Sequence, residues 1–167
     1  MDTQNRFHTD SSFRLVRAEA VLGLLALVYL LCAFASDVNW SRFLVAFALV
    51  DLVGYLPGAL AFRRALARRR PADRTAPRIA ARFHHLYNLT HSFLTCGVVL
   101  GLWFVASGDV EWAMLALPLH LLGDRGLFGN TYKPTSLPFE PWPRPLRNAD
   151  DNHDVSVGTT SSERAAA

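Results

Sequence analysis

Apolar residues along this chain gather in four long blocks, and most of the charged residues lie between the blocks. The blocks cover residues 18–35, 43–62, 83–106 and 110–128. An α-helix rises about 1.5 Å per residue, so about 20 apolar residues cross a hydrocarbon core about 30 Å thick. A soluble core would distribute its apolar residues at helical or strand periods instead. The pattern therefore predicts an all-α fold, a four-helix transmembrane bundle in one domain over residues 14–133.

The first and fourth blocks each allow a second interpretation. The first follows two arginines and ends in Ala33-Phe34-Ala35, so it also resembles a cleavable signal peptide, although it exceeds the usual length of about 7–15 apolar residues. The fourth block reaches the length of a span only if Asp124 and Arg125 lie at the membrane boundary. A re-entrant half-helix is the alternative there. In the second block Pro57 predicts a kink, because proline lacks an N–H.

Positive charge predicts the orientation of the bundle. The loop between the second and third blocks has one acid, Asp73, against eight arginines: Arg63, Arg64, Arg68, Arg69, Arg70, Arg74, Arg78 and Arg82. Short basic loops remain on the cytoplasmic side of a membrane. With four spans, both termini are then cytoplasmic (N-in/C-in).

Composition indicates which membrane holds the protein and which class of partner its basic loop meets. Lys133 is the only lysine, and such an arginine bias is typical of a GC-rich bacterial genome, so we expect a multi-pass protein of the bacterial inner (plasma) membrane. The arginine cluster adjoins an apolar block, which indicates lipid head groups and not nucleic acid as its partner. Phosphate-binding glycine loops and nucleophile elbows are absent from the sequence. Cys32 and Cys96 lie in apolar blocks and form no metal-binding spacing.

Both ends of the chain differ from the blocks. Residues 1–13 are polar and are expected to be flexible. Residues 134–167 form a cytoplasmic tail that is rich in proline at first, which excludes a regular helix, and small and polar later, which indicates disorder. Within the first part, Leu137, Phe139 and Trp142 are expected to lie along the bundle or the head groups.

Polar residues inside the spans indicate a site, because burying them in a membrane is costly. They gather in the cytoplasmic half of the predicted bundle. Asp51, for example, lies roughly 16 Å from the cytoplasmic end of its helix at about 1.5 Å per residue. The set is Glu19, Asp51, His84, His91, His120 and Asp124.

Spacing brings part of this set together. His84, Asn88 and His91 share one helix face, and His120 and Asp124 are one turn apart. The last two spans are joined by a short turn and should pack antiparallel, which lets His91 and His120 approach. Imidazoles with carboxylates can bind a divalent metal ion and leave a position open for water. We therefore expect His91, His120 and Asp124 as metal ligands.

Other polar residues receive other expected roles. Glu19 or Asp51 is the expected general base, if burial makes it basic enough. The residues expected to bind an anionic head group of the substrate are His84, His85, Asn88 and Arg125. Three alternatives stay open: a proton relay, hydrogen bonds that only hold the helices together, and ion pairs of Glu19 with Arg82 or of Asp124 with Arg125.

Several spaced motifs resemble an uncharacterised family of small bacterial four-helix membrane proteins over roughly residues 15–140. They are Glu19, Asp51, Gly54-Tyr55-Leu56-x-Gly58, Tyr87-Asn88-Leu89-x-His91, His120-x-x-x-Asp124-Arg125 and a glycine-containing step to Lys133. The resemblance implies a helical bundle and brings no established activity. The family's last motif reads Asp-Arg-x-x-Gly-Tyr-Gly-x-Lys. This chain departs from it between Asp124 and Lys133, so no role for its tyrosine carries over.

A shorter pattern is similar to membrane-bound metal-dependent hydrolases. It consists of His84 or His85, then Thr90-His91-Ser92, then His120-x-x-x-Asp124. This likeness implies metal-assisted hydrolysis of a lipid-like substrate. A non-enzymatic subunit that binds a membrane-protein partner through its polar face is the alternative, and a small transporter or proton path ranks third.

Overall fold

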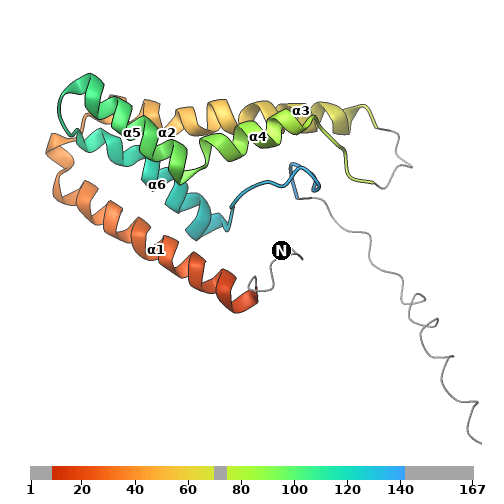
Figure 1. Cartoon of the computed structure of the whole chain (residues 1–167), viewed down its shortest axis with the longest axis horizontal. Helices are drawn as coiled ribbons and strands as arrows, with labels where there is room; N and C mark the ends of the chain where they lie inside the picture. The colour runs from red at the N-terminus through yellow and green to blue at the C-terminus, as the bar shows by residue number, and fades with distance from the viewer. Residues whose placement is uncertain (1–8, 70–74, 142–167) are drawn as a thin grey trace, which may run out of the picture.

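The computed structural model describes residues 9–69 and 75–141, and all regular elements within these ranges are helical (Figure 1). The α-helices are α1 (Asp10–Ala33), α2 (Trp40–Gly54), α3 (Leu56–Ala67), α4 (Ala81–Thr90), α5 (Phe93–Ser107) and α6 (Ala116–Gly123). Short 3₁₀ helices, η1 (Ala35–Asp37) and η2 (Trp112–Leu115), and a π-helix, η3 (Asp124–Phe128), complete the described chain. The predicted all-α fold class is confirmed for these residues.

Some predictions fall outside the described residues. They concern the first part of the expected flexible N-terminus, the middle of the arginine loop, Trp142 and the expected disordered tail. The ranges outside the description are 1–8, 70–74 and 142–167.

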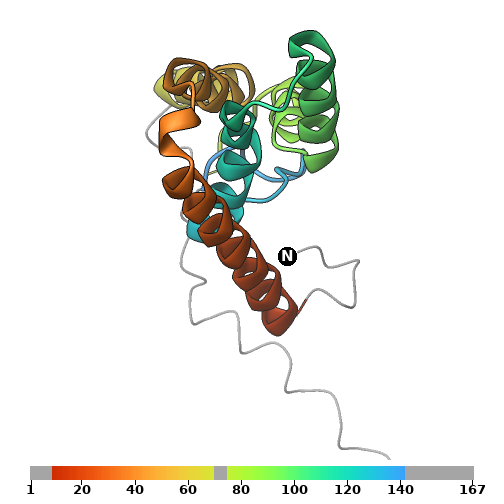
Figure 2. The same ribbon diagram turned by 90° about the vertical axis from the view of Figure 1, so that its left-hand side faces the viewer.

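Helix α6 lies at the centre of the molecule. The end-on view shows it between α1, α2 and α5, and it packs against all three (Figure 2). Ala113 and Ala116 are fully buried there, against Leu31 of α1 and Phe43 of α2. Small side chains let helix backbones approach closely, which matters most where lipid supplies no hydrophobic driving force. The shortest of the described α-helices thereby carries its side chains into the middle of the molecule.

Helix α1 begins at Asp10, before the start of the first apolar block. Thr9 and Ser12 explain the early start, because each side chain accepts a hydrogen bond from the other residue's backbone N–H and so forms a capping box. One turn before Val21, Arg17 donates hydrogen bonds to the carbonyls of Gly126 and Leu127, at 2.8 and 2.7 Å. Helix α1 is therefore tied to η3 as well as to α6.

The second apolar block forms α2 and α3, which meet at Tyr55. Pro57 lies in the first turn of α3, where its missing N–H leaves one helical hydrogen bond unmade. The two helices still count together as one stretch of 28 residues, Trp40–Ala67, that is apolar and long enough to cross a membrane.

The third apolar block is divided at His91 and Ser92 into α4 and α5, which are bent by 56°. Local hydrogen bonds explain the break. The Ser92 side chain caps α5 by accepting from the Leu94 N–H, and the Thr90 hydroxyl donates to backbone carbonyls of the preceding turn, of which Tyr87 lies at 3.0 Å. The sequence pattern predicted one span here; the structure gives two helices at an angle.

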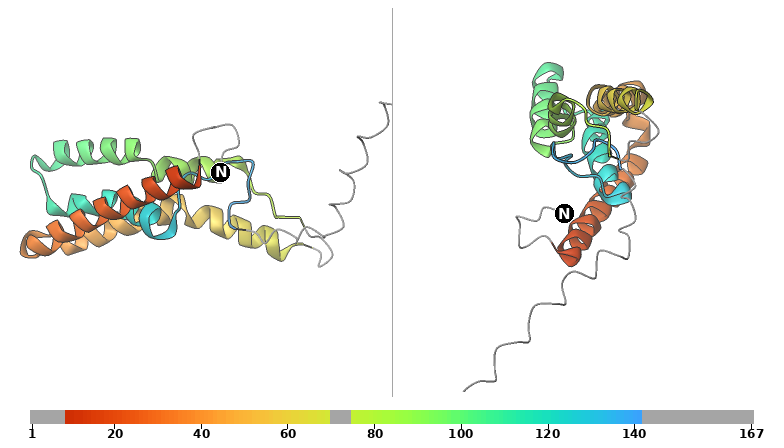
Figure 3. Two further views of the ribbon diagram at one scale, coloured as in Figure 1. Left: turned by 90° about the horizontal axis from the view of Figure 1, so that it is seen from below. Right: turned by 90° about the vertical axis from the view of Figure 1, so that its right-hand side faces the viewer.

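The fourth block is helical from Trp112 to Phe128, but only its middle part is α-helix. The π-helical turn η3 ends at Gly129, whose φ of 69° lies in the left-handed region that favours glycine. Gly126 lies against α1: a Cβ there would come within 3.0–3.3 Å of Val21 atoms. Figure 3 shows η3 beside α1, with the following segment turning away toward α3 and α4.

Two helical stretches, Asp10–Ala33 and Trp40–Ala67, are long and apolar enough to cross a membrane. The bent pair of α4 and α5 makes a third if it counts as a single span. Large apolar side chains on α5 face outward, among them Leu94 at 80% and Val105 at 77% exposure. Such a surface suits hydrocarbon and not water, which indicates membrane association.

Candidate metal centre

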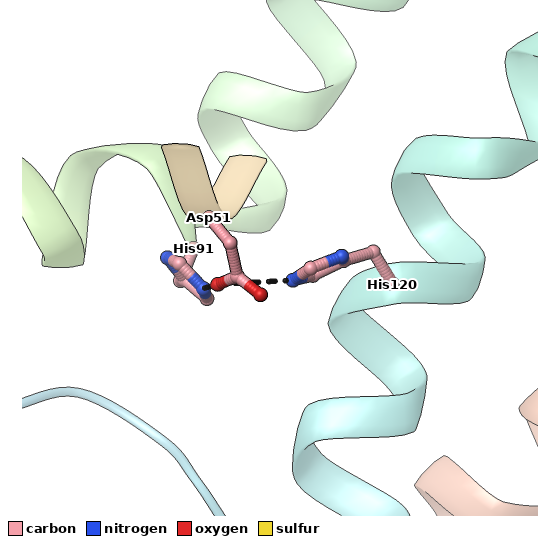
Figure 4. A group of neighbouring side chains, drawn as sticks. All are labelled: Asp51, His91 and His120. Atoms are coloured by element: carbon pink, nitrogen blue, oxygen red, sulfur yellow. Dashed lines mark ion pairs between the residues drawn. The ribbon is translucent and has the colours of Figure 1, made fainter. Parts of the chain in front are cut away.

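Two histidines and an aspartate from three elements converge at the centre of the molecule. Asp51 extends from the last turn of α2, His91 lies at the α4–α5 break, and His120 lies on α6 (Figure 4). The three donor atoms lie within 4.8 Å of one another. Asp124, at the start of η3, adds a carboxylate oxygen 3.3 Å from His91 Nε2.

The spacing of these atoms fits a shared cation. His91 Nε2 lies 3.3 Å from Asp51 Oδ1, and His120 Nε2 lies 3.6 Å from the same oxygen. Asp124 Oδ2 lies 3.3 Å from His91 Nε2 and 4.0 Å from His120 Nε2. Two ligands bound tetrahedrally at about 2.0–2.1 Å from one ion are about 3.3–3.4 Å apart. Both Asp51 contacts are within about 0.3 Å of that separation, whereas Asp124 matches it toward His91 alone, so Asp51 is the better third ligand and Asp124 lies beside the ion.

The Tyr87 carbonyl favours one tautomer of His91. Its Nδ1 lies 3.0 Å from the Tyr87 carbonyl, which can only accept, so a proton on Nδ1 is favoured. The Tyr87 ring stacks on the imidazole with centroids 3.9 Å apart and planes 17° apart. Backbone and ring together therefore hold Nε2 toward the two carboxylates, as a second shell does for metal-binding histidines.

His91 Nε2 is close to both carboxylates and well aligned with neither. It is buried, and no group in the described part of the chain meets hydrogen-bond geometry with it. A neutral imidazole protonated at Nδ1 would turn the Nε2 lone pair toward two anions, which is unfavourable without a cation. Either a proton on Nε2 or a bound metal ion resolves this conflict.

His120 is buried at 5% exposure beside the Phe47 ring, whose centroid is 4.6 Å away. Its own ring centroid lies 5.5 Å from that of His91, so the structure brings together the two histidines that the antiparallel argument paired. Neither ring nitrogen of His120 has a hydrogen-bond partner among the described residues. A buried imidazole in this position gains from coordinating an ion.

The centre is enclosed on one side and open on the other. The side chains of His91 and His120 are 3% and 4% exposed, and that of Asp124 is 18% exposed. Asp51 is 51% exposed and marks the opening. A bound ion with an open position at that side could be reached by water or by a substrate.

Not every residue expected at the site lies there. Asp51, expected as a base, lies among the donor atoms. Glu19 is exposed on α1 and is not part of the cluster, and His85 is exposed on α4. Arg125 stacks over the Phe93 ring at 4.2 Å and is 5.7 Å from the Tyr132 ring, so it joins η3 to the start of α5.

His84 and Asn88 contact the segment after η3, which we call the tail segment (residues 129–141). His84 Nε2 lies 3.2 Å from the Leu137 carbonyl. The Asn88 side chain donates to the Lys133 carbonyl at 3.0 Å and accepts from the Lys133 N–H at 2.7 Å. These two residues, which were expected to bind substrate, hold this segment in the structure.

Sequence reasoning gave Lys133 and Phe139 no part near the site. Phe139 is 2% exposed and fills a notch at Gly58, where a Cβ would collide with its ring. Lys133 Nζ donates to the Phe139 carbonyl at 2.6 Å, lies 3.4 Å from Glu140 and faces the rings of Tyr55, Tyr87 and Phe139. Burial lowers the pKa of Lys133, and the Glu140 charge opposes this only in part. The fact that Lys133 is the only lysine in the sequence was the signal that could have pointed to it.

Neither family models nor curated proteins nor solved structures yield a match to this chain. Its class therefore rests on its own geometry: an all-helical, membrane-associated protein with a central histidine–aspartate cluster.

Proposed function

We propose that this protein is a multi-pass protein of the bacterial inner membrane that holds a divalent metal ion and hydrolyses an ester bond of a lipid. Asp51, His91 and His120 are the proposed ligands. The observation that carries the proposal is the convergence of their donor atoms within 4.8 Å of one another on three separate elements. Two of the three donors are buried imidazoles that lack a well-formed hydrogen bond at Nε2.

The proposed arrangement in the membrane has four spans with both termini in the cytoplasm. The first two spans are α1 and α2–α3, the third is the bent pair α4–α5, and the fourth is the helical run through η2, α6 and η3. The arginine-rich loop after α3 supports the orientation, since positive loops remain in the cytoplasm. Asp51 then lies well within the membrane, about 16 Å from Trp40 at about 1.5 Å per residue.

Asp124 is the proposed general base. It lies within 4.0 Å of both histidines and is better shielded than Asp51. A divalent ion held by Asp51, His91 and His120 would polarise a carbonyl oxygen and lower the pKa of bound water. Asp124 accepts the proton of the attacking water, whose oxygen bonds to the ester carbon. The bond to the alcohol oxygen then breaks, and that oxygen takes the proton from Asp124.

Metal content tests the binding site. We expect one divalent ion per chain in wild-type protein purified in mild detergent without chelators. His91→Ala should lose more than nine tenths of it, because the remaining donors cannot complete the site. His85→Ala is the matched control, an exposed histidine on α4, the helix that ends just before His91, and should keep its metal. A wild-type protein that stays metal-free in zinc- and manganese-supplemented buffers would contradict the metal centre and favour a proton-sharing or partner-binding site.

Asp124→Asn tests the division of roles. We expect it to retain the ion and to lose about 10²- to 10⁴-fold in the rate of lipid ester hydrolysis, the usual range for a general base. Asp109→Asn, in the exposed turn before η2, is the control and should remain active. Turnover of extracted bacterial phospholipids, followed by mass spectrometry, measures both. Full activity of Asp124→Asn would remove it from the mechanism.

A metal-free proton-sharing site is the second candidate. One observation favours it: His91 Nε2 lies at the same 3.3 Å distance from an oxygen of each carboxylate. An imidazolium there would satisfy both anions without a metal. This candidate predicts wild-type protein without bound metal, with activity or partner binding that is lost when His91 is changed.

A further inference from the structure

A groove lies beside the metal centre. The inference drawn from it rests on the proposed function and concerns the part of the lipid substrate that the groove would hold. The groove has a volume of about 310 Å³, near the lower end of the range of ligand pockets. It lies between α2 and α5 and is floored by α6. The residues that line it are apolar except for Thr90, Thr95 and Cys96.

The bend at His91 explains why the groove exists. Helix α4 packs along α2, but the 56° turn directs α5 away from α2, and α6 packs against both α2 and α5. Figure 2 shows α2 and α5 on opposite sides of α6. The floor is closed, with Val50, Cys96 and Leu121 at 7%, 6% and 2% exposure.

The rim of the groove is open toward the side of the molecule. Leu49 and Val53 on α2 are 48% and 46% exposed, and Val99 on α5 is 40% exposed. All three belong to helices in stretches apolar enough to lie in a membrane. The opening therefore faces hydrocarbon in the proposed arrangement.

The inner end of the groove lies beside the residues of the metal centre. Val50, Thr90 and Leu121 line the groove and directly adjoin Asp51, His91 and His120 in the chain. Thr90 Oγ1 is also 3.0 Å from His91 Nδ1. A molecule that filled the groove would thus have one end separated from the cluster by the His91 ring and the walls that carry Asp51 and His120.

We propose that this groove holds the acyl chain of the substrate lipid, with the ester group of the lipid on the other side of the His91 ring, at the Asp51, His91 and His120 cluster. An acyl chain matches the apolar lining and enters sideways from the bilayer. A helix from a second copy is the competing occupant, and the oligomeric state of the protein distinguishes it from a lipid.

Photo-labelling tests the proposal without relying on hydrolysis. The probe is a single-chain phospholipid with a diazirine on its acyl chain, added to protein in phosphatidylcholine nanodiscs. We expect adducts on the groove walls, residues 46–53 and 95–103, in wild type. Val99→Trp fills the groove and should reduce these adducts at least fivefold, with metal content unchanged. Val53→Trp, on the opposite rim, provides a second blocking variant.

Val98→Trp is the matched control, since its neighbouring position on α5 is exposed outside the groove. It should label like wild type. Equal wall labelling in Val99→Trp and Val53→Trp would overturn the proposal. So would a dimer, seen by native mass spectrometry, that either variant separates, because a second copy would then occupy the groove. Wall labelling of a metal-free wild type would contradict the hydrolase proposal and leave lipid binding intact.

Discussion

At the scale of single residues, the arrangement around His91 decides the chemistry. A carbonyl favours a proton on Nδ1, a tyrosine ring fixes the plane, and two carboxylates face Nε2. With Nδ1 protonated, two carboxylates so close to Nε2 are stabilised by a cation between them. A metal ion or a proton on Nε2 can supply this positive charge. The first predicts bound metal in the purified protein, and the second predicts none.

The sequence led to His91, His120 and Asp124 because helix periodicity and a short turn are enough to bring them together. It placed Asp51 near them as a general base and not as a ligand. Depth along a helix follows from residue count, whereas the direction in which a side chain points depends on how the helix is rotated in the packed bundle. Glu19 shows the same limit, since its depth was plausible but its side chain faces outward.

Lys133 provides a prediction at this scale. Its pKa should lie below the usual value of about 10.4, because burial removes the ammonium from water. The folded protein then loses this proton before the unfolded chain does. The contribution of Lys133 to stability therefore rises with pH between the two pKa values.

Nuclear magnetic resonance of ¹³C-methylated protein measures this pKa, and the single lysine makes the assignment direct. Phe139→Leu opens the surroundings of Lys133 and should move its pKa back toward 10.4. Phe128→Leu, at an exposed position, should leave it unchanged. A wild-type value at or above that of Phe139→Leu would contradict the prediction.

At the scale of elements, close contact between α2 and α4 shapes the metal centre. Gly54 leaves space that Thr90 and His91 occupy: a Cβ at this position would collide with Thr90 Oγ1 and lie 3.2 Å from His91 Cε1. Four residues later, in the first turns of α3, Gly58 receives Phe139. The two glycines of the Gly-Tyr-Leu-x-Gly motif thus admit two different neighbours.

Gly54→Ala should weaken metal binding although Gly54 supplies no ligand. The added methyl group displaces Thr90 and His91, and changes around metal ligands typically cost about 10- to 100-fold in affinity. Overpacking should also cost about 1–3 kcal/mol of stability. Gly97→Ala is the control on α5, where a Cβ meets nothing within 4 Å. Competition with a fluorescent chelator measures both affinities, and equal values would contradict the role of Gly54.

Apolar block lengths were sufficient to predict helices, but not where they break. The third block divides because the side chains of Thr90 and Ser92 hydrogen-bond to the backbone, and Ser92 caps α5. Such bonds compete with the helix but leave little trace in the pattern of apolar residues. The start of α1 at Asp10 likewise depends on a capping box that lies before the apolar block. The tail segment was predicted only as a proline-rich stretch near the bundle.

At the scale of the whole molecule, the central position of α6 gives the site its shape. Helices α1, α2 and α5 surround it, and the tail segment closes the end near α3 and α4 (Figure 1). Phe139 connects Gly58 and Tyr87, and Tyr87 in turn stacks on His91. The tail segment is thereby linked to the metal centre through a continuous set of contacts.

The proposed orientation predicts which side reagents reach. In a protein with Cys32 and Cys96 replaced by alanine, Asp37→Cys in η1 should react with an impermeant maleimide on intact cells. Ala67→Cys at the end of α3 should react only after the inner membrane is permeabilised. Both positions are exposed, so local shielding does not explain a difference. The reverse pattern would invert the proposed topology.

X-ray absorption at the metal edge tests the proposed centre most directly. The purified protein should show nitrogen and oxygen ligands at about 2.0–2.1 Å, with the scattering signature of two imidazoles and no sulfur. Asp51→Asn should lose or alter that shell. A protein without metal, a sulfur ligand, or a spectrum without imidazole scattering would contradict a centre made by Asp51, His91 and His120.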